Sequence, residues 1–203
     1  MAAVRALSFA DCILLFFAYA SAEMLALAEA SSTSRSLAEE LARIPLDTLN
    51  LSLGRKSLTG IIPRNITLFS NLQVIDLSSN MLRGTIPREL GKLANLTEIY
   101  LDGNELSGII PAALGNLVNL VELSLYANQL SGNIPTELGN LVNLRYLDLY
   151  KNQLSGNIPA ELGNLVKLEH LHLSHNLLTG IIPAELGNLV NLIPLTLYTN
   201  QLS

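Results

Sequence analysis

The side chains best suited to recognition in this sequence are tyrosines, histidines and carboxylates, and they recur at regular intervals. Five of the six tyrosines and all three histidines lie in short leucine-containing segments that return every 24 residues. The candidate ligand-binding residues are Asp76, Glu98, Tyr100, Asp102, Glu122, Tyr126, Tyr146, Asp148, Tyr150, His170, His172 and Tyr198. Because tyrosine offers a large rigid ring with a polar tip, this set favours the binding of a ligand.

Catalysis and metal binding are not expected of these residues. The sequence lacks a glycine-rich phosphate loop, kinase motifs and a nucleophile with an activating base. His170 and His172 would share one side of a strand, but a metal site needs three or four converging ligands. A pH-sensitive contact is the better interpretation, because histidine titrates in the mildly acidic range. We therefore expect neither an enzyme nor a bound cofactor or metal.

Composition narrows the class of protein further. The 12 Lys and Arg residues are scattered, whereas nucleic-acid binding needs a clustered basic face. Apolar residues make up 49% of the chain and can bury a core, which excludes disorder. A single cysteine, Cys12, excludes a disulfide scaffold. The 46 leucines and 19 asparagines indicate internal repetition.

The elements that must position the candidate residues belong to one repeated unit. Full 24-residue copies begin at Thr48, Leu72, Leu96, Leu120, Leu144 and Leu168, and a half copy begins at Leu192. The consensus of the copies opens with L-x-x-L-x-L, which alternates like a half-buried strand. Leu-Ser-Gly-x-Ile-Pro follows as a turn into an extended stretch, and Leu-Gly-x-Leu forms a short helix-like return. One copy cannot bury its leucines alone, whereas stacked copies bury them against each other.

One polar residue accompanies the leucines that we expect to be buried. Repeat position 9 is asparagine in six of the seven copies, and the first copy has Lys56 instead. The row consists of Asn80, Asn104, Asn128, Asn152, Asn176 and Asn200. A buried amide should be hydrogen-bonded, and it can both donate to and accept from the turning backbone. We expect this row to link successive coils rather than to bind a ligand.

The repeat unit resembles a known family. The consensus L-x-x-L-x-L-x-x-N-x-L-[ST]-G-x-I-P-x-x-L-G-x-L spans residues 48–203 and is similar to the plant-specific class of leucine-rich repeat. Proteins with this repeat include ectodomains of plant receptor kinases and secreted polygalacturonase-inhibitor-like proteins. The resemblance implies an α/β repeat solenoid, a curved right-handed superhelix with a parallel β-sheet on its concave face. It also implies extracellular recognition of peptides or proteins in signalling or defence.

Three features depart from the family pattern. Arg83 replaces the Ser or Thr of the Leu-Ser-Gly motif. The cysteine pair that normally staples the N-terminal cap is missing, so a helical cap over residues 23–47 must hold by packing alone. The sequence stops at Ser203, halfway through a copy. That end favours a fragment, a truncated gene product or a terminal coil covered by a partner.

The concave face would carry the candidate residues, because side chains at repeat positions 3, 5 and 7 alternate with buried leucines. This face and its rims hold six acids against three bases. Tyr126 and Tyr150 occupy the same position in successive copies, so their rings should be neighbours, as should Glu98 and Glu122. We expect a peptide or protein segment to lie on the tyrosines, with Asp102 and the two glutamates meeting a basic group. The alternative is a merely solvated sheet.

The N-terminus is typical of a secretory signal. Residues 1–22 contain Arg5, an apolar run over residues 12–20 and small residues at a cleavage site. The apolar stretch is too short for the roughly 20 residues that span a bilayer. We therefore predict secretion to the apoplast or cell surface, with a membrane anchor only if a longer product carries one. The sequons at Asn50, Asn65 and Asn95 are then glycosylation candidates.

These patterns leave several functions open. The leading interpretation is an extracellular peptide- or protein-binding module of the receptor or co-receptor type. Its partner would be a peptide or protein ligand, such as a receptor kinase or a microbial enzyme. The alternatives are a secreted inhibitor of microbial wall-degrading enzymes, an ice-binding solenoid, and a truncated fragment without an independent role. The ice-binding alternative is weakened because repeat position 14 varies between Ile, Thr and Asn.

Overall fold

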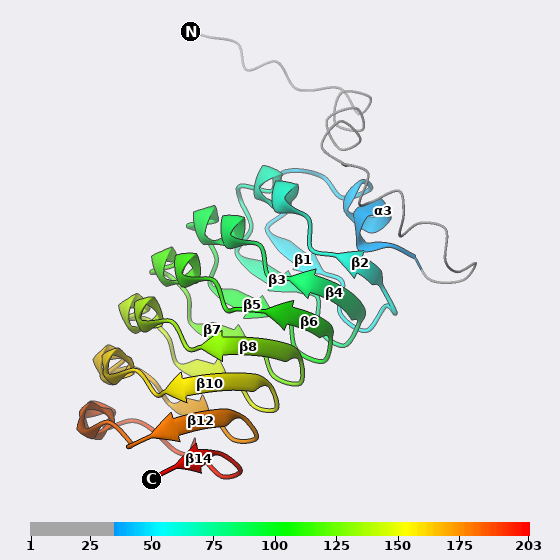
Figure 1. Cartoon of the computed structure of the whole chain (residues 1–203). Coiled ribbons are helices and arrows are strands. Elements are labelled where there is room, and N and C mark those ends of the chain that lie inside the picture. Colours follow the sequence, from blue (N-terminus) through cyan, green and yellow to red (C-terminus); the bar gives the residue numbers. More distant parts are fainter. Residues whose placement is uncertain (1–34) are drawn as a thin grey trace, which may run out of the picture.

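The computed structural model describes residues 35–203 as one continuous stack of coils (Figure 1). The expected signal peptide of residues 1–22 and the start of the lead-in lie outside the described residues. Within residues 35–203, no helix combines the length and apolar character needed to cross a membrane. Each 24-residue copy makes one coil, so the repeat read from the sequence is also the structural unit.

The L-x-x-L-x-L segments form the first sheet, which is parallel and has the strand order β1-β3-β5-β7-β9-β11-β13. Its strands are β1 (Asn50–Ser52), β3 (Val74–Asp76), β5 (Glu98–Tyr100), β7 (Glu122–Ser124), β9 (Tyr146–Asp148), β11 (His170–His172) and β13 (Leu195–Thr196). Residues pair 24 apart, as Glu98 with Glu122. Identical repeat positions therefore stand directly beside one another in straight rows.

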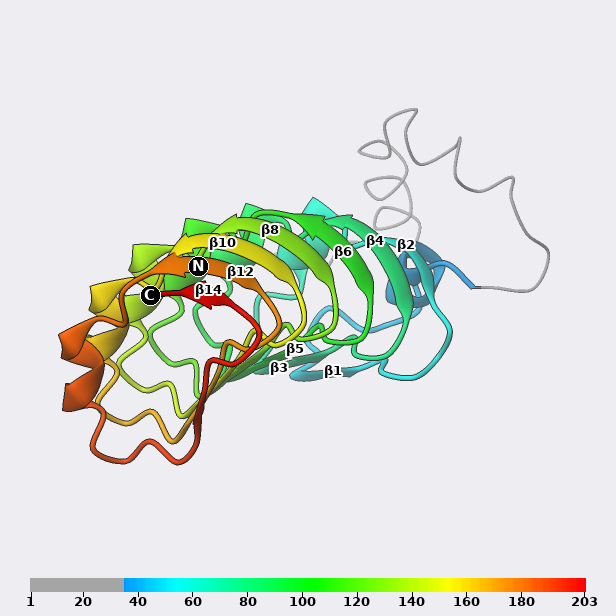
Figure 2. The same ribbon diagram turned by 60° about the horizontal axis from the view of Figure 1, so that its bottom comes forward.

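The Leu-Ser-Gly-x-Ile-Pro stretch, predicted only as a turn into an extended segment, forms a second parallel sheet along the stack (Figure 2). Its strands are β2 (Thr59–Ile61), β4 (Met81–Thr85), β6 (Glu105–Gly108), β8 (Gln129–Asn133), β10 (Gln153–Asn157), β12 (Leu177–Gly180) and β14 (Gln201–Leu202). Pairing is offset here, because Ser131 lies opposite Gln153 rather than opposite Ser155. Identical positions in this sheet are thus shifted from one coil to the next.

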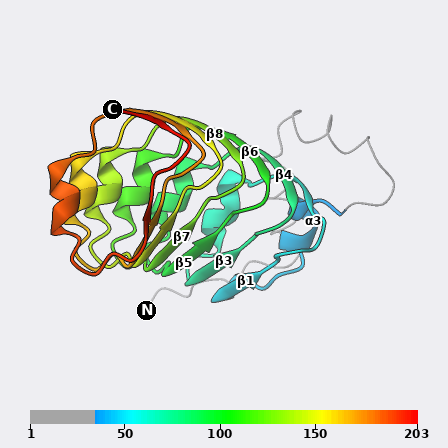
Figure 3. The ribbon, with the colours of Figure 1, turned by 90° about the horizontal axis from the view of Figure 1, so that it is seen from below.

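Short 3-10 helices close the six full coils, where the sequence predicts a helix-like return (Figure 3). They are η1 (Arg64–Leu68), η2 (Arg88–Lys92), η3 (Ala112–Asn116), η4 (Thr136–Asn140), η5 (Ala160–Asn164) and η6 (Ala184–Asn188). Successive helices approach closely at repeat position 20. A Cβ added to Gly115 would lie 2.2 Å from the carbonyl oxygen of Glu137, whereas one added to Gly187 would meet nothing within 4 Å. Glycine at this position therefore sets how closely neighbouring coils stack.

The asparagine row lies between the coils and bonds to two of them at once. Asn128 shows the pattern: its Oδ1 accepts from the Leu106 N–H at 3.0 Å, and its Nδ2 donates to the carbonyls of Leu101 at 3.0 Å and Leu125 at 3.2 Å. The other five asparagines repeat these bonds. Each asparagine bonds to the backbone of the preceding coil. The first coil has no preceding coil of the repeat, so its position 9 can hold Lys56 instead.

The core is one cluster of leucines and isoleucines that runs the length of the stack. Helix α3 (Leu37–Leu41) covers its N-terminal end beside β2 (Figure 1). The helix begins at a capping box in which the Ser36 side chain accepts from the Glu39 N–H and the Glu39 side chain accepts from the Ser36 N–H. Leu37 and Leu41 are buried, so this end is closed by packing without a disulfide.

Candidate ligand-binding face

All twelve predicted binding residues lie on the first sheet or in the loops that directly follow its strands. The strands alternate as expected: Ile99 of β5 is buried, while Glu98 and Tyr100 on either side of it are partly exposed. We call the surface formed by repeat positions 3, 5 and 7 the concave face. Because pairing in this sheet is in register, each of these positions forms a row that crosses the coils.

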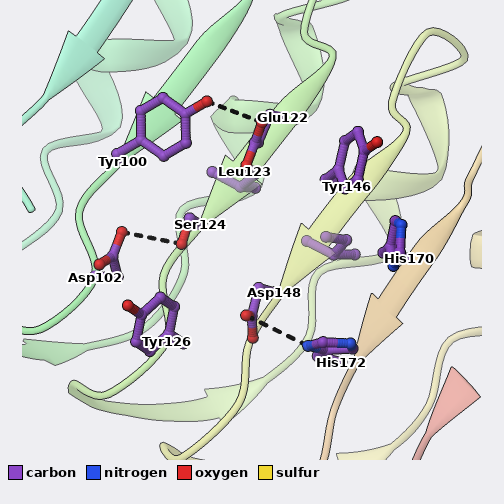
Figure 4. Close-up of a pocket in the computed structure, with 11 residues that line it drawn as sticks. Tyr100, Asp102, Glu122, Leu123, Ser124, Tyr126, Tyr146, Asp148, His170 and His172 are labelled. Carbon is purple, nitrogen blue, oxygen red and sulfur yellow. Dashed lines mark hydrogen bonds and ion pairs between the residues drawn. The ribbon is translucent and has the colours of Figure 1, made fainter. Parts of the chain in front are cut away.

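Part of the concave face is hollowed into an open recess of about 350 Å³ (Figure 4). It is lined by Tyr100, Asp102, Glu122, Leu123, Ser124, Tyr126, Tyr146, Leu147, Asp148, His170 and His172. Eight of these were predicted from the sequence; Ser124 was not. The predicted residues Asp76, Glu98, Tyr150 and Tyr198 lie outside this lining. The signal that could have revealed Ser124 is its small size, since Tyr100 and Asp148 precede and follow it in the position-5 row.

Two glutamates converge on one phenol along one side of the recess. The Tyr100 hydroxyl lies 3.1 Å from a Glu98 oxygen and 2.8 Å from a Glu122 oxygen. A hydroxyl has one hydrogen, so it serves one carboxylate at a time. Burial and hydrogen bonding to Glu122 raise the pKa of Tyr100, with a smaller contribution from Glu98, so the phenol keeps its proton. The expected glutamate pair therefore forms, but it already has a donor.

Asp102 occupies a different environment at the base of the recess. Only 6% of the residue is exposed, and its Oδ1 accepts from the Ser124 hydroxyl at 3.0 Å. Burial and the negative charge of Asp102 raise the pKa of Tyr126, whose ring stands beside it. The strand geometry thus places a nearly buried carboxylate next to an aromatic ring.

The histidines extend the recess toward the later coils. His172 Nδ1 lies 3.5 Å from Asp148 Oδ2, and the His170 ring stacks on Tyr146 with centroids 4.7 Å apart. Burial raises the pKa of Asp148, although the Tyr150 N–H and His172 both favour its ionised form. Burial and these two partners therefore act in opposite directions on the ionisation of Asp148.

The ring of Tyr150 has a neighbour that was not predicted from the sequence. It meets His175 edge-on, with centroids 5.2 Å apart, and His175 in turn meets Tyr198 at 5.3 Å. His175 lies at a repeat position with positive φ, which directs the chain away from the strand. The resulting row of rings runs along the rim, so Tyr150 and Tyr198 flank the recess instead of lining it.

An ion pair borders the recess beside Tyr146. Arg145 and Glu169, which follow each other at the same repeat position, form this pair on the edge of the sheet. The Tyr146 hydroxyl donates to the other Glu169 oxygen at 3.2 Å. This hydrogen bond raises the pKa of Tyr146 and helps to hold its ring where His170 stacks on it.

The remaining candidate sites are distributed over other surfaces. In the range 35–203, no three His, Cys, Asp or Glu side chains gather closely enough to hold a metal ion. Among the sequons, Asn50 is exposed on β1 and Asn65 is half-buried in η1. Asn95 is exposed, but its Nδ2 donates to the Ser70 carbonyl at 3.3 Å. A glycan on Asn95 would therefore compete with a contact between coils.

Family models described as leucine rich repeat match residues 46–106 and 94–154, and a further repeat model matches residues 167–189. Together these matches cover more than half of the chain. None of the curated protein sequences compared with the chain matches it significantly.

Several solved structures are similar to the chain. The plant peptide hormone receptor RGFR1, in complex with RGF2, has 39% identity and a TM-score of 0.76 over 78% of this chain and 26% of its own. The Arabidopsis HAESA ectodomain, in complex with an IDA peptide hormone, has 39% identity and a TM-score of 0.71 over 74% and 26%. A plant ice-binding protein has 35% identity and a TM-score of 0.70 over 75% and 49%. The chain thus spans about a quarter of either receptor ectodomain.

Proposed function

The chain belongs to the leucine-rich repeat family, and we propose that it is a peptide- or protein-binding module whose ligand lies along the concave face. The observation that carries this proposal is the concentration of rings and carboxylates around one recess of the first sheet. RGFR1 and HAESA, which are similar to this chain, were solved with peptide hormones bound. Tyrosines beside exposed polar groups give such a surface both contact area and hydrogen-bonding partners.

We propose further that the module acts outside the cell, in the manner of a receptor or co-receptor ectodomain. The secretory character of residues 1–22 supports this location. The ectodomain of HAESA, at 39% identity, supports the receptor-like role. The negative concave face also suits a basic protein target, so a microbial enzyme is a partner that the same binding assays can include.

The similarity to a plant ice-binding protein calls for a comparison with the second sheet. Ice binding is favoured by straight rows of identical exposed side chains. In the second sheet the pairing offset places Ser131 beside Gln153, and the exposed position-14 residues change from Ile109 to Asn133 in adjacent coils. The straight rows belong to the first sheet, where the side chains differ from coil to coil. This arrangement supports the recognition of an irregular ligand such as a peptide.

The test is whether selected ligands depend on the concave rings. Linear peptides would be selected from a random library on the full chain, and their affinities measured for Tyr126→Ala/Tyr150→Ala. We expect a loss of about tenfold or more, because exposed tyrosines often act as anchors. The control is Val118→Ala/Val142→Ala, which removes two exposed side chains from the turns that follow η3 and η4, outside the first sheet. Equal losses of affinity in both variants, or no loss in either, would reject binding at the concave face.

A further inference from the structure

The recess owes its depth to one small side chain. Ser124 occupies position 5 of its coil, and the same position holds Tyr100 in the coil before and Asp148 in the coil after. The larger residues stand around the serine, which is only 6% exposed although it faces the open side of the sheet. Figure 4 shows Ser124 at the centre, with rings of Tyr100, Tyr126 and Tyr146 around it. The sheet therefore has a binding depression at a defined register.

The charge of this depression is one-sided. Three carboxylates line it, from Asp102, Glu122 and Asp148, and no Lys or Arg is among its lining residues. Each outer carboxylate has a neighbour of its own: Tyr100 donates to Glu122, and His172 lies beside Asp148. The recess thus carries excess negative charge that a cationic group would balance.

Asp102 is the carboxylate with the greatest need of such a partner. Only 6% of the residue is exposed, the Ser124 hydroxyl donates to its Oδ1, and the Tyr126 hydroxyl is its second hydrogen-bonding neighbour. An ionised carboxylate has about four acceptor sites, and burying a charge is costly unless it is paired. Asp102 also belongs to the lining of the recess, so a ligand can reach it. Its burial, its accessibility to a ligand and the neutrality of both hydroxyl neighbours point together to a missing cation.

We propose that the recess receives the guanidinium group of an arginine side chain carried by the peptide ligand, with Asp102 as its ion-pair partner. This inference rests on the proposed function and specifies the ligand. A planar guanidinium can bond a carboxylate through two N–H groups and lie against aromatic faces, which an ammonium group cannot do equally well. The recess volume of about 350 Å³ is near the lower end of the ~300–1,000 Å³ of small-molecule pockets, so it suits one side chain.

The position of the anchor also changes. From the sequence, Glu98, Asp102 and Glu122 are expected to meet the basic group together. In the structure the Tyr100 hydroxyl occupies the space between the two glutamates, whereas Asp102 is nearly buried and has only neutral hydroxyl neighbours. The arginine would therefore enter beside Tyr126, and Glu122 would contribute charge from the wall.

The experiment is a double-mutant cycle on the full chain with peptides selected from a random linear library. Each concave-face binder would be synthesised with arginine, and again with citrulline, which keeps the shape but is neutral. Asp102→Asn should weaken the arginine peptide by about tenfold or more, because an interfacial charge pair is broken. The citrulline peptide should bind both proteins within about twofold, because the coupled pair is already absent. Asp47→Asn, which removes an exposed carboxylate outside the first sheet, is the matched control and should leave both peptides unchanged.

A second variant tests the recess by shape instead of charge. Ser124→Leu would fill the depression and should abolish discrimination between the arginine and citrulline peptides. Lysine in place of arginine should bind at least about fivefold more weakly, because it lacks the planar fork.

The outcomes separate this inference from the proposed function. Binders that need Tyr126 and Tyr150 but tolerate citrulline and Asp102→Asn would overturn the arginine anchor and leave the binding face intact. Lysine binding as well as arginine would overturn the choice of a guanidinium. If every selected binder is indifferent to the concave-face variants, the proposed function falls as well. A tenfold coupling confined to Asp102 and arginine would establish the anchor.

Discussion

The contacts between coils and the concave face are made from the same 24-residue unit, but the copies agree in one and differ in the other. Between coils, asparagine at position 9 and glycine at position 20 recur because each must fit an identical neighbour. On the concave face, position 5 runs through Tyr100, Ser124, Asp148 and His172 in consecutive coils. Side chains that point to solvent meet no such requirement. The difference teaches that copies of a repeat can be compared within one chain to separate packing from recognition.

The largest expected loss of stability comes from adding one methyl group between two coils. In Gly115→Ala the new Cβ would lie 2.2 Å from the Glu137 carbonyl oxygen, so the coils must move apart. We expect a loss of about 3 kcal/mol or more, at the upper end of overpacking effects. Urea unfolding followed by circular dichroism would measure it.

The same substitution at the last helix is the control. Gly187 has nothing within 4 Å of an added Cβ, so Gly187→Ala should be neutral or slightly stabilising. Equal losses at both positions would show that glycine is needed for its own backbone and not for the approach of the next coil.

The second test removes an amide from the asparagine row. Asn128→Ala leaves the Leu106 N–H and the Leu101 carbonyl without their partner in a buried site. Unpaired buried groups of this kind cost about 1–3 kcal/mol, so the urea midpoint should fall accordingly. Asn140→Ala, at an exposed position of η4, should change it by less than about 0.5 kcal/mol. A small effect at Asn128 would mean that water replaces the amide.

The third test concerns a carboxylate on the concave face. Burial raises the pKa of Asp148 above its unfolded value, so the native state binds this proton more tightly than the unfolded chain does. Its ionisation therefore lowers stability as the pH rises through the interval between the unfolded and native pKa values. Asp148→Asn should raise the melting temperature modestly at pH 7, and the gain should vanish below about pH 4.

The exposed Asp47 provides a control for net charge. Asp47→Asn removes the same charge and should leave the melting temperature nearly unchanged at both pH values. A lower melting temperature for Asp148→Asn at pH 7 would show that the contacts of Asp148 with His172 and the Tyr150 N–H outweigh the cost of its burial.

Much of this fold could be predicted from the sequence because the strongest signals are local and repeated. The leucine spacing gives the first sheet and the short return, and Ser36 with Glu39 gives the start of α3. The second sheet was predicted only as an extended stretch, because glycine and proline ordinarily argue against a strand. Its strands nevertheless pair, since Gly132 and its equivalents take positive φ values and proline follows the paired residues.

The site was less predictable than the fold. Repetition predicted that the candidate rows share one face, but it did not predict which side chains contact each other across the rows. Tyr150 pairs with His175 because position 8 takes a left-handed conformation in every coil, including at Lys151 and Ala127. These residue types do not prefer that conformation, so the coil geometry imposes it. The role of Ser124 could not be predicted either, because the depth of a recess depends on how far the neighbouring side chains project from the sheet.

The smallest expected effect on stability comes from a substitution on the concave face. Ser52 is the exposed position-5 residue of β1, and Ser52→Tyr would give the first coil the side chain that Tyr100 has in the third. Because this ring would project into solvent beside Asp76, we expect a change of less than about 0.5 kcal/mol in the urea midpoint. A loss above about 1 kcal/mol would mean that concave positions are also constrained by packing. A tolerated exchange would show that the scaffold leaves this face free to vary, which is the property that recognition of different ligands requires.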